Sequence, residues 1–213
     1  MEKIQNYIGG MIYEAVSGAY LNNYNPATGK VYSLIPDSDE RDVEKAVEAA
    51  KAAFPAWSAM SSEKRLGYLM AIANKIEENL EELAIAESKD NGKPLWLAKA
   101  VDIPRASSNF KFYATAIMHD NTDCFDMGGV AVNYTLRKPI GVAGCISPWN
   151  LPLYLFTWKI APALATGNCV VAKPSEITPM TAYLLSKICI EIGLPAGVCL
   201  LYTSPSPRDV EES

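Results

Sequence analysis

Apolar side chains recur at helical spacing along two long stretches of the chain. The first follows Asp39, a good helix-capping residue, and Pro55 is expected to end it. The second begins at Ser61 or Ser62 and carries leucine and isoleucine side chains on one face as far as Leu83. Two amphipathic helices that each bury one face are therefore predicted.

Shorter segments around these helices predict a third helix and several hairpins. Residues 98–118 have helical spacing, with a break or kink near Pro104. Turns that contain glycine at 7–10 and 25–30 predict small hairpins before the helices. Another turn at 126–129 leads into residues that alternate as a strand does. Short strands are thus expected at the edge of the domain.

One stretch has the order strand, turn, helix, strand. Residues 141–146 form a short apolar run, a segment of helical length then ends at Gly167, and a second apolar run covers 169–172. A further helix over 178–193 and a strand over 198–202 extend the pattern. Such βαβ units bind ligands beyond the carboxyl ends of their strands. Three polar residues are expected at those ends: Asn150, Lys173 and Glu176.

The balance of charge and hydrophobicity excludes several kinds of partner. The 213 residues carry a formal net charge of -5 and are 49% hydrophobic, with no basic cluster, which argues against nucleic acid or an anionic membrane as a partner. The uncharged window 139–158 has the length of a membrane span, but its prolines and Asn150 argue against one. The first ten residues lack the apolar region of a secretory signal, so a cytoplasmic location is expected.

The cysteines, the histidine and the acidic residues predict no metal site. The five cysteines and the single His119 lack the spacing of metal ligands. Cys145, Cys169 and Cys189 lie in apolar contexts and are expected to be buried, reduced thiols. Four glutamates fall within residues 77–82, and a solvated helix face explains them better than a metal does.

Several rare residues recur at fixed offsets in the central stretch. They read Pro-Trp-Asn followed by Pro, then Trp-Lys, then Pro-Ala-Leu-Ala-Thr-Gly-Asn, and finally Lys-Pro-Ser-Glu-Ile-Thr-Pro. Over residues 7–198 the chain resembles the aldehyde dehydrogenase superfamily. The upstream segments SKDNGKPLWLA and DIPRASSNFKFYA are similar to the branch that acts on 2-aminomuconic semialdehyde.

The resemblance implies an α/β fold, namely an incomplete Rossmann-like three-layer NAD-binding domain preceded by helices and edge strands. It assigns residues 1–198 to the amino-terminal part of that domain. It assigns strands near 120–138 to an extension that joins subunits, so a homo-oligomer is expected for the full-length protein. Residues 199–213 depart from the family, and the Ser-Pro-Ser-Pro sequence followed by charges predicts a disordered tail.

The resemblance also implies NAD as the cofactor, although the usual glycine fingerprint of dinucleotide-binding folds is absent. Lys173 and Glu176 would hold the adenosine ribose, and a carboxylate there would repel the 2′-phosphate of NADP. The cofactor groove would be lined by Ile146, Ser147, Pro148 and Trp149. The alternative is that Lys173 and Glu176 form an ordinary charge pair at a strand end.

Four residues are candidates for contact with an aldehyde substrate. Asn150 resembles the amide donor that stabilises the oxyanion in the family, but it could instead only close the turn at Pro148. Leu151 and Trp158 would face the aldehyde tunnel, though either could belong to the core. Arg105 is similar to a position that binds a substrate carboxylate, and a salt bridge on a helix surface would explain it equally well.

The chemistry of the family needs a thiolate nucleophile and a general base, and neither is found. None of the five cysteines lies in a context like that of the catalytic one. The leading interpretation is an NAD-dependent oxidoreductase that converts an aldehyde, such as 2-aminomuconic semialdehyde, to its carboxylate, with these 213 residues inactive by themselves. The alternative is a catalytically inactive, truncated fragment that binds NAD or joins subunits.

Overall fold

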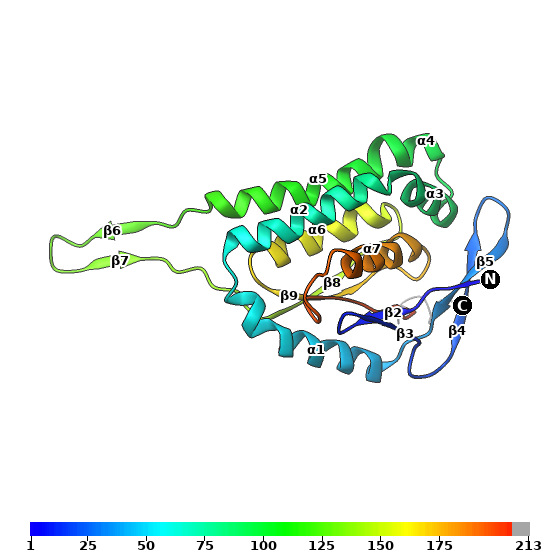
Figure 1. The fold of residues 1–213 in the computed structure, drawn as a ribbon, viewed down its shortest axis with the longest axis horizontal. Coiled ribbons are helices and arrows are strands. Elements are labelled where there is room, and N and C mark those ends of the chain that lie inside the picture. Colours follow the sequence, from blue (N-terminus) through cyan, green and yellow to red (C-terminus); the bar gives the residue numbers. More distant parts are fainter. Residues whose placement is uncertain (206–213) are drawn as a thin grey trace.

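A five-stranded sheet lies at the centre of the computed structural model, which describes residues 1–205 (Figure 1). Its strands are β2 (Asn6–Ile8), β3 (Met11–Tyr13), β8 (Val142–Ile146), β9 (Cys169–Lys173) and β10 (Cys199–Leu201). They lie in the order β3, β2, β10, β9, β8. β8, β9 and β10 are parallel, whereas β2 is antiparallel to β10 and to β3. Every residue of β9 is buried, as expected for a strand that is covered on both faces.

Helices cover both faces of this sheet. α1 (Glu40–Ser58) packs on one face, and α6 (Pro152–Ala165) and α7 (Met180–Glu191) pack on the other (Figure 1). A further layer contains α2 (Ser62–Glu78) and α5 (Ile103–Ala116), which pack against each other and against α6. The expected α/β architecture of three layers is confirmed. None of the helices within residues 1–205 is both long and apolar enough to cross a membrane.

The expectation that Pro55 ends the first helix is wrong, because α1 continues to Ser58. Proline removes the hydrogen bond to the carbonyl four residues earlier, here that of Lys51. Lys51 is exposed, so water can satisfy this carbonyl. The buried indole of Trp57 donates to the Leu164 carbonyl at 3.3 Å and holds the last turn against α6.

The second predicted helix is two helices. α2 starts after Ser61, whose side chain accepts from the Lys64 N–H, and it ends at Glu78. α3 (Leu80–Asn91) follows after Asn79 and ends at Gly92, which adopts a left-handed φ of 78°.

The third predicted helix is broken, as expected, close to Pro104. α4 (Leu95–Leu97) passes into a π-helical segment (Ala98–Asp102), and α5 begins at Ile103 with the proline in its first turn. A short 3-10 turn (Ile117–His119) follows α5.

Two hairpins lie outside the central sheet. β4 (Tyr20–Asn25) and β5 (Lys30–Pro36) form the first, and β1 (Glu2–Lys3) joins it beside β5. β6 (Cys124–Asp126) and β7 (Val132–Tyr134) form the second, which projects as an arm beyond the helices (Figure 1). The hairpins expected around the turns at 25–30 and 126–129 are therefore present.

The predicted strand over 198–202 is present, and the expectation that a disordered tail starts at residue 199 is wrong. Cys199–Leu201 forms β10 between β9 and β2, in the interior of the sheet. The backbone of Thr203 is still held, because its N–H donates to Asn6 Oδ1 and its carbonyl accepts from the Ser38 N–H. Residues 206–213, where the remainder of the predicted tail falls, lie outside the described residues.

Candidate cofactor and oxyanion site

The carboxyl ends of β8 and β9 lie next to each other. Their parallel register pairs Ile146 with Lys173, the last residue of each strand. The Ser147 N–H then donates to the Lys173 carbonyl at 3.0 Å, and Thr178 Oγ1 donates to the Trp149 carbonyl at 3.4 Å. The turn after β8 and the turn after β9 therefore form one continuous surface at the edge where parallel α/β sheets bind ligands.

A charged pair and exposed apolar groups share this surface. Lys173 Nζ lies 3.1 Å from Glu176 Oε2, and the two side chains are only 10% and 16% exposed. Ile146 and Trp149, in contrast, are 67% and 56% exposed. Ser147 is buried, and its hydroxyl has no hydrogen-bond partner among the described residues. A partly buried ion pair beside open apolar surface suits a ligand with both polar and flat apolar parts.

Asn150 lies on the exposed turn between β8 and α6, as does Pro148. The Asn91 side-chain amide, from the end of α3, donates to the Trp149 carbonyl at 2.9 Å and to the Asn150 carbonyl at 3.4 Å. Within residues 1–205, no hydrogen bond involves the Asn150 side chain itself. The turn is thus anchored through its backbone, and the Asn150 amide remains available to a ligand.

A buried charge cluster lies beneath this turn. Lys93 Nζ is 3.1 Å from Glu87 Oε1 and 2.8 Å from Asp102 Oδ2, and all three side chains are at most 8% exposed. Glu87 also accepts from the Leu153 N–H, in the first turn of α6, at 3.4 Å. Burial raises the pKa of Glu87 to about 7, and the Lys93 ammonium opposes this rise.

A second buried carboxylate, Asp90, joins α3 to two other parts of the fold. It accepts from the Met180 N–H at the start of α7 at 2.7 Å, from Asn23 Nδ2 at 2.8 Å, and from the Tyr32 hydroxyl. Burial raises the pKa of Asp90 to about 6, while these three donors favour its ionised form.

Sequence reasoning missed Glu87, Asp90 and Asn91 as functional residues. The only signal for them was their position, within the segment SKDNGKPLWLA for Asp90 and Asn91 and just before it for Glu87.

Arg105 and Trp158 are brought together by a residue that the sequence did not single out. The exposed Arg105 guanidinium lies 5.2 Å from the centre of the Tyr154 ring, and this ring lies 5.1 Å from that of Trp158. Trp158 is 46% exposed and so is not a core residue, whereas Leu151 is half-buried at the start of α6. No carboxylate forms a salt bridge with Arg105 among the described residues, so the helix-surface alternative has no partner there.

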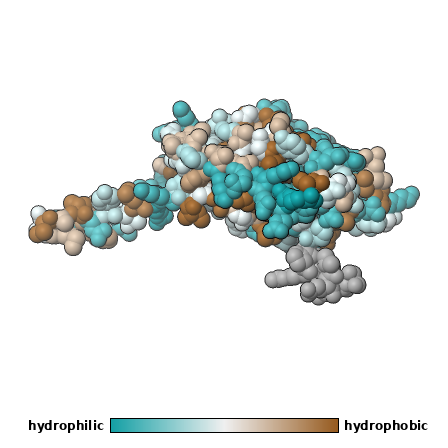
Figure 2. Space-filling view, turned by 90° about the horizontal axis from the view of Figure 1, so that it is seen from below, coloured by the Kyte–Doolittle hydropathy of each residue, from teal (hydrophilic) through white to brown (hydrophobic). Residues whose placement is uncertain are grey.

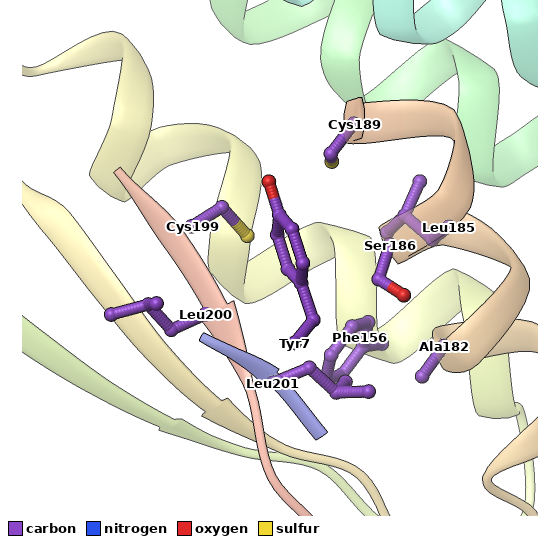
Figure 3. Close-up of a pocket in the computed structure, with 9 residues that line it drawn as sticks. All are labelled: Tyr7, Phe156, Ala182, Leu185, Ser186, Cys189, Cys199, Leu200 and Leu201. Atoms are coloured by element: carbon purple, nitrogen blue, oxygen red, sulfur yellow. The ribbon is translucent and has the colours of Figure 1, made fainter. Parts of the chain in front are cut away.

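The cysteines are unsuited to act as the nucleophile. Cys145, Cys169, Cys189 and Cys199 are buried, which confirms the expectation for the first three. Burial raises the pKa of Cys145 and of Cys169 to about 11, so both are thiols at neutral pH. Cys189 and Cys199 line a small apolar cavity with Tyr7 between α7 and β10 (Figure 3). Cys124 is exposed, but it lies on the projecting hairpin.

Three of the four glutamates between residues 77 and 82 pair with different lysines instead of converging on one point. Glu77, Glu78 and Glu81 lie 2.6, 2.9 and 2.5 Å from the ammonium groups of Lys111, Lys75 and Lys99. Within residues 1–205, no group of three or more histidine, cysteine or acidic side chains could hold a metal ion.

The fold and the polar strand ends define a Rossmann-like α/β protein with a candidate ligand site at the carboxyl edge of its sheet. The aldehyde dehydrogenase family matches residues 13–212, and the chain belongs to this family. The 2-aminomuconic semialdehyde dehydrogenases of Bos taurus and Danio rerio are 48% and 50% identical to it over 206 residues. Each alignment covers 96% of this chain but only 42% of the relative, so this chain spans less than half of the length of these relatives.

Solved structures agree with this assignment. A putative aldehyde dehydrogenase from Burkholderia cenocepacia is similar with a TM-score of 0.92 at 39% identity. An NAD+ complex of aldehyde dehydrogenase from Bacillus cereus is similar with a TM-score of 0.94 at 36% identity. They cover 96% and 97% of this chain, which in turn spans 42% of each.

Proposed function

We propose that this chain supplies the cofactor-binding surface and the oxyanion donor of an NAD-dependent aldehyde dehydrogenase. The observation that carries the proposal is the close approach of two turns. The turn with Asn150 and the turn with Lys173 and Glu176 meet at the carboxyl edge of one parallel sheet. The nucleophile and the general base would come from a region of the full-length protein that corresponds to the part of the relatives outside this match.

NAD fits the polar and apolar groups of this surface. Lys173 would donate to a ribose hydroxyl and Glu176 would accept from the same sugar, which their 3.1 Å separation allows. Exposed Ile146, Pro148 and Trp149 would cover apolar faces of the cofactor. Bound NAD would accept a hydride from the substrate. The Glu176 carboxylate would repel the 2′-phosphate of NADP.

Asn150 would act on the aldehyde oxygen. When a thiolate adds to an aldehyde, the carbonyl oxygen becomes an oxyanion, and an amide N–H aimed at it stabilises the negative charge without a counter-ion. The position of Asn150 at the start of α6 adds the favourable end of the helix dipole.

The substrate would be a semialdehyde that carries a carboxylate. Arg105 is exposed without an acidic partner among the described residues, and it lies over Tyr154, beside Trp158. A guanidinium held over an aromatic ring can receive a carboxylate through two parallel hydrogen bonds. The muconic semialdehyde dehydrogenases among the relatives are named for substrates of this chemical kind.

The test uses the full-length protein with NAD and two aldehydes of equal length, one ending in a carboxylate and one in a neutral amide. NADH formation is expected with NAD, and much slower NADPH formation is expected with NADP. Arg105→Met is expected to raise KM for the carboxylated aldehyde about ten- to a hundredfold, because it removes one charge-assisted interaction with the substrate. KM for the neutral aldehyde should stay unchanged.

Lys111→Met, on the same helix and paired with Glu77, is the matched control. Absence of NADH formation with every aldehyde would refute the proposed function. An equal KM for the carboxylated aldehyde in the wild type and in Arg105→Met would refute only the assignment of Arg105.

The projecting hairpin supports a second role, in joining subunits. Phe125, Val132 and Tyr134 are 62%, 62% and 61% exposed on this arm. Figure 2 shows hydrophobic residues gathered towards its tip, in contrast to the hydrophilic surface at the centre of the molecule. Isolated apolar residues on a surface are ordinary, but an arm that exposes several in succession is typical of an interface. The partner would be a second copy of the chain.

Phe125→Lys combined with Tyr134→Lys is expected to lower the native mass of the full-length protein, as measured by light scattering. The charges would oppose burial of the arm against a partner. Tyr24→Lys is the control, since Tyr24 is an aromatic residue of similar exposure, 53%, on the other hairpin. An unchanged mass in the double variant would exclude this arm as the subunit contact.

A further inference from the structure

The last two turns of α3 hold three other segments at the carboxyl edge of the sheet. Glu87 accepts from the Leu153 N–H at 3.4 Å, and Asp90 accepts from the Met180 N–H at 2.7 Å. Asn91 donates to the Trp149 carbonyl at 2.9 Å. Each partner belongs to the turn after β8 or to the start of a helix that follows one of the parallel strands. The proposed chemistry assigns no task to these α3 residues.

Asn91 has a fixed place because α3 ends abruptly after it. Gly92 adopts a φ of 78°, and its N–H donates to the Ser88 carbonyl at 2.9 Å, which closes the helix end. A Cβ added to Gly92 would come within 3.0 Å of Pro26, so the chain is also confined by the neighbouring hairpin. The Asn91 side chain therefore extends from a rigid support towards the turn that follows β8.

The Asn91 side-chain amide donates to two backbone carbonyls, one on each side of the Asn150 Cα. It reaches the Trp149 oxygen at 2.9 Å and the Asn150 oxygen at 3.4 Å. Thr178 Oγ1 donates to the Trp149 oxygen from the opposite turn, at 3.4 Å. With the carbonyls on both sides of its Cα held, residue 150 has little freedom to rotate about its backbone. The Cα–Cβ bond of Asn150 must then leave the turn in one direction, which limits where its amide can reach.

We infer that Asn91 is a positioning residue, which aims the Asn150 amide at the aldehyde oxygen by holding the carbonyls of residues 149 and 150. The inference rests on the proposed function for its catalytic consequence. Asn91 does not touch the substrate. Its effect reaches the reaction only through Asn150, because an error of about 1 Å in a catalytic group costs on the order of a hundredfold in rate.

The experiment compares Asn91→Asp with Asn79→Asp in the full-length protein. Aspartate has the shape of asparagine but no N–H donor, so at residue 91 it would face two carbonyl oxygens. Asn79 is the matched control, because its amide donates to the Lys75 carbonyl at 2.8 Å at the other end of α3. We expect Asn91→Asp to lower kcat about ten- to a hundredfold with KM for NAD unchanged. Asn79→Asp should leave kcat near that of the wild type.

Two further measurements separate positioning from general damage. In an Asn150→Ala background, Asn91→Asp should lower kcat no further, because there is no amide left to aim. Hydrogen exchange of the backbone amides at residues 149–151 and 153 should accelerate in Asn91→Asp and not in Asn79→Asp.

Equal kcat in the two aspartate variants would overturn the inference. It would also be overturned if Asn91→Asp lowered kcat by the same factor in the Asn150→Ala background as in the wild type. If the wild-type protein oxidises no aldehyde, the proposed function fails, and hydrogen exchange then decides the inference alone. Unchanged exchange at residues 149–151 and 153 would overturn it, whereas faster exchange would establish Asn91 as the anchor of this turn.

Discussion

Replacement of Lys93 by methionine is expected to destabilise the fold by about 3–5 kcal/mol, because it leaves buried carboxylates without a cation. Glu87 and Asp102 are 0% and 2% exposed, and Lys93 contacts both at 3.1 and 2.8 Å. Methionine has nearly the length of lysine, so the loss would come from charge and not from packing. The free energy of unfolding in urea measures the effect.

Lys99→Met is the control for this variant. Lys99 lies 2.5 Å from Glu81, but the two side chains are 36% and 65% exposed, so water screens the pair and its loss should cost less than about 1 kcal/mol. Adding Glu87→Gln to Lys93→Met should restore part of the stability, since it removes one of the two unpaired charges. Similar free energies of unfolding for Lys93→Met and Lys99→Met would show that the cluster is not needed for stability.

Asn150→Ala is expected to lower kcat of the full-length protein by about two to three orders of magnitude, the usual loss for one oxyanion donor. KM for the aldehyde should change little, since the interaction is made mainly in the transition state. Steady-state kinetics with NAD and a carboxylated semialdehyde measure both constants.

A purely structural Asn150 would behave differently. If this residue only closes the turn at Pro148, alanine would lower the thermal midpoint and leave kcat of the folded enzyme within about twofold of the wild type, since its donor would take no part in the transition state. Asn22→Ala is a suitable control, because Asn22 lies on β4 and its amide donates to Tyr24 Oη at 3.3 Å and to no other group among the described residues. The thermal midpoint recorded beside kcat separates the two roles.

The residues at the strand ends could be identified from local pattern. The apolar runs that became β8 and β9, the glycine that ends the intervening helix, and the parallel arrangement together predict that Asn150, Lys173 and Glu176 share one edge of the sheet. The register of Ile146 with Lys173 agrees with this expectation. Periodicity also predicted α1, α2 and α7, although it joined α2 to α3 and ended α1 too early at Pro55.

Local pattern could not identify what supports these residues, because the supporting contacts join distant parts of the chain. Asn91 is 58 residues from Trp149, and Asp90 is 90 residues from Met180. In the sequence, Glu87, Asp90 and Asn91 resemble the polar face of an ordinary solvated helix. Burial raises the pKa of Glu87 and Asp90. This burial depends on which helices cover α3, and the spacing of apolar residues in the sequence does not show which helices those are.

The sequence by itself thus determined the family, the order of helices and strands and the chemical groups at the edge of the sheet, since these follow from side-chain type and spacing. Only the tertiary structure decided which of those groups are exposed, which are held, and by what. The Asn150 amide is available because Asn91 and Thr178 occupy the carbonyls beside it. Each such contact exists only after helices and strands far apart in the chain have packed together.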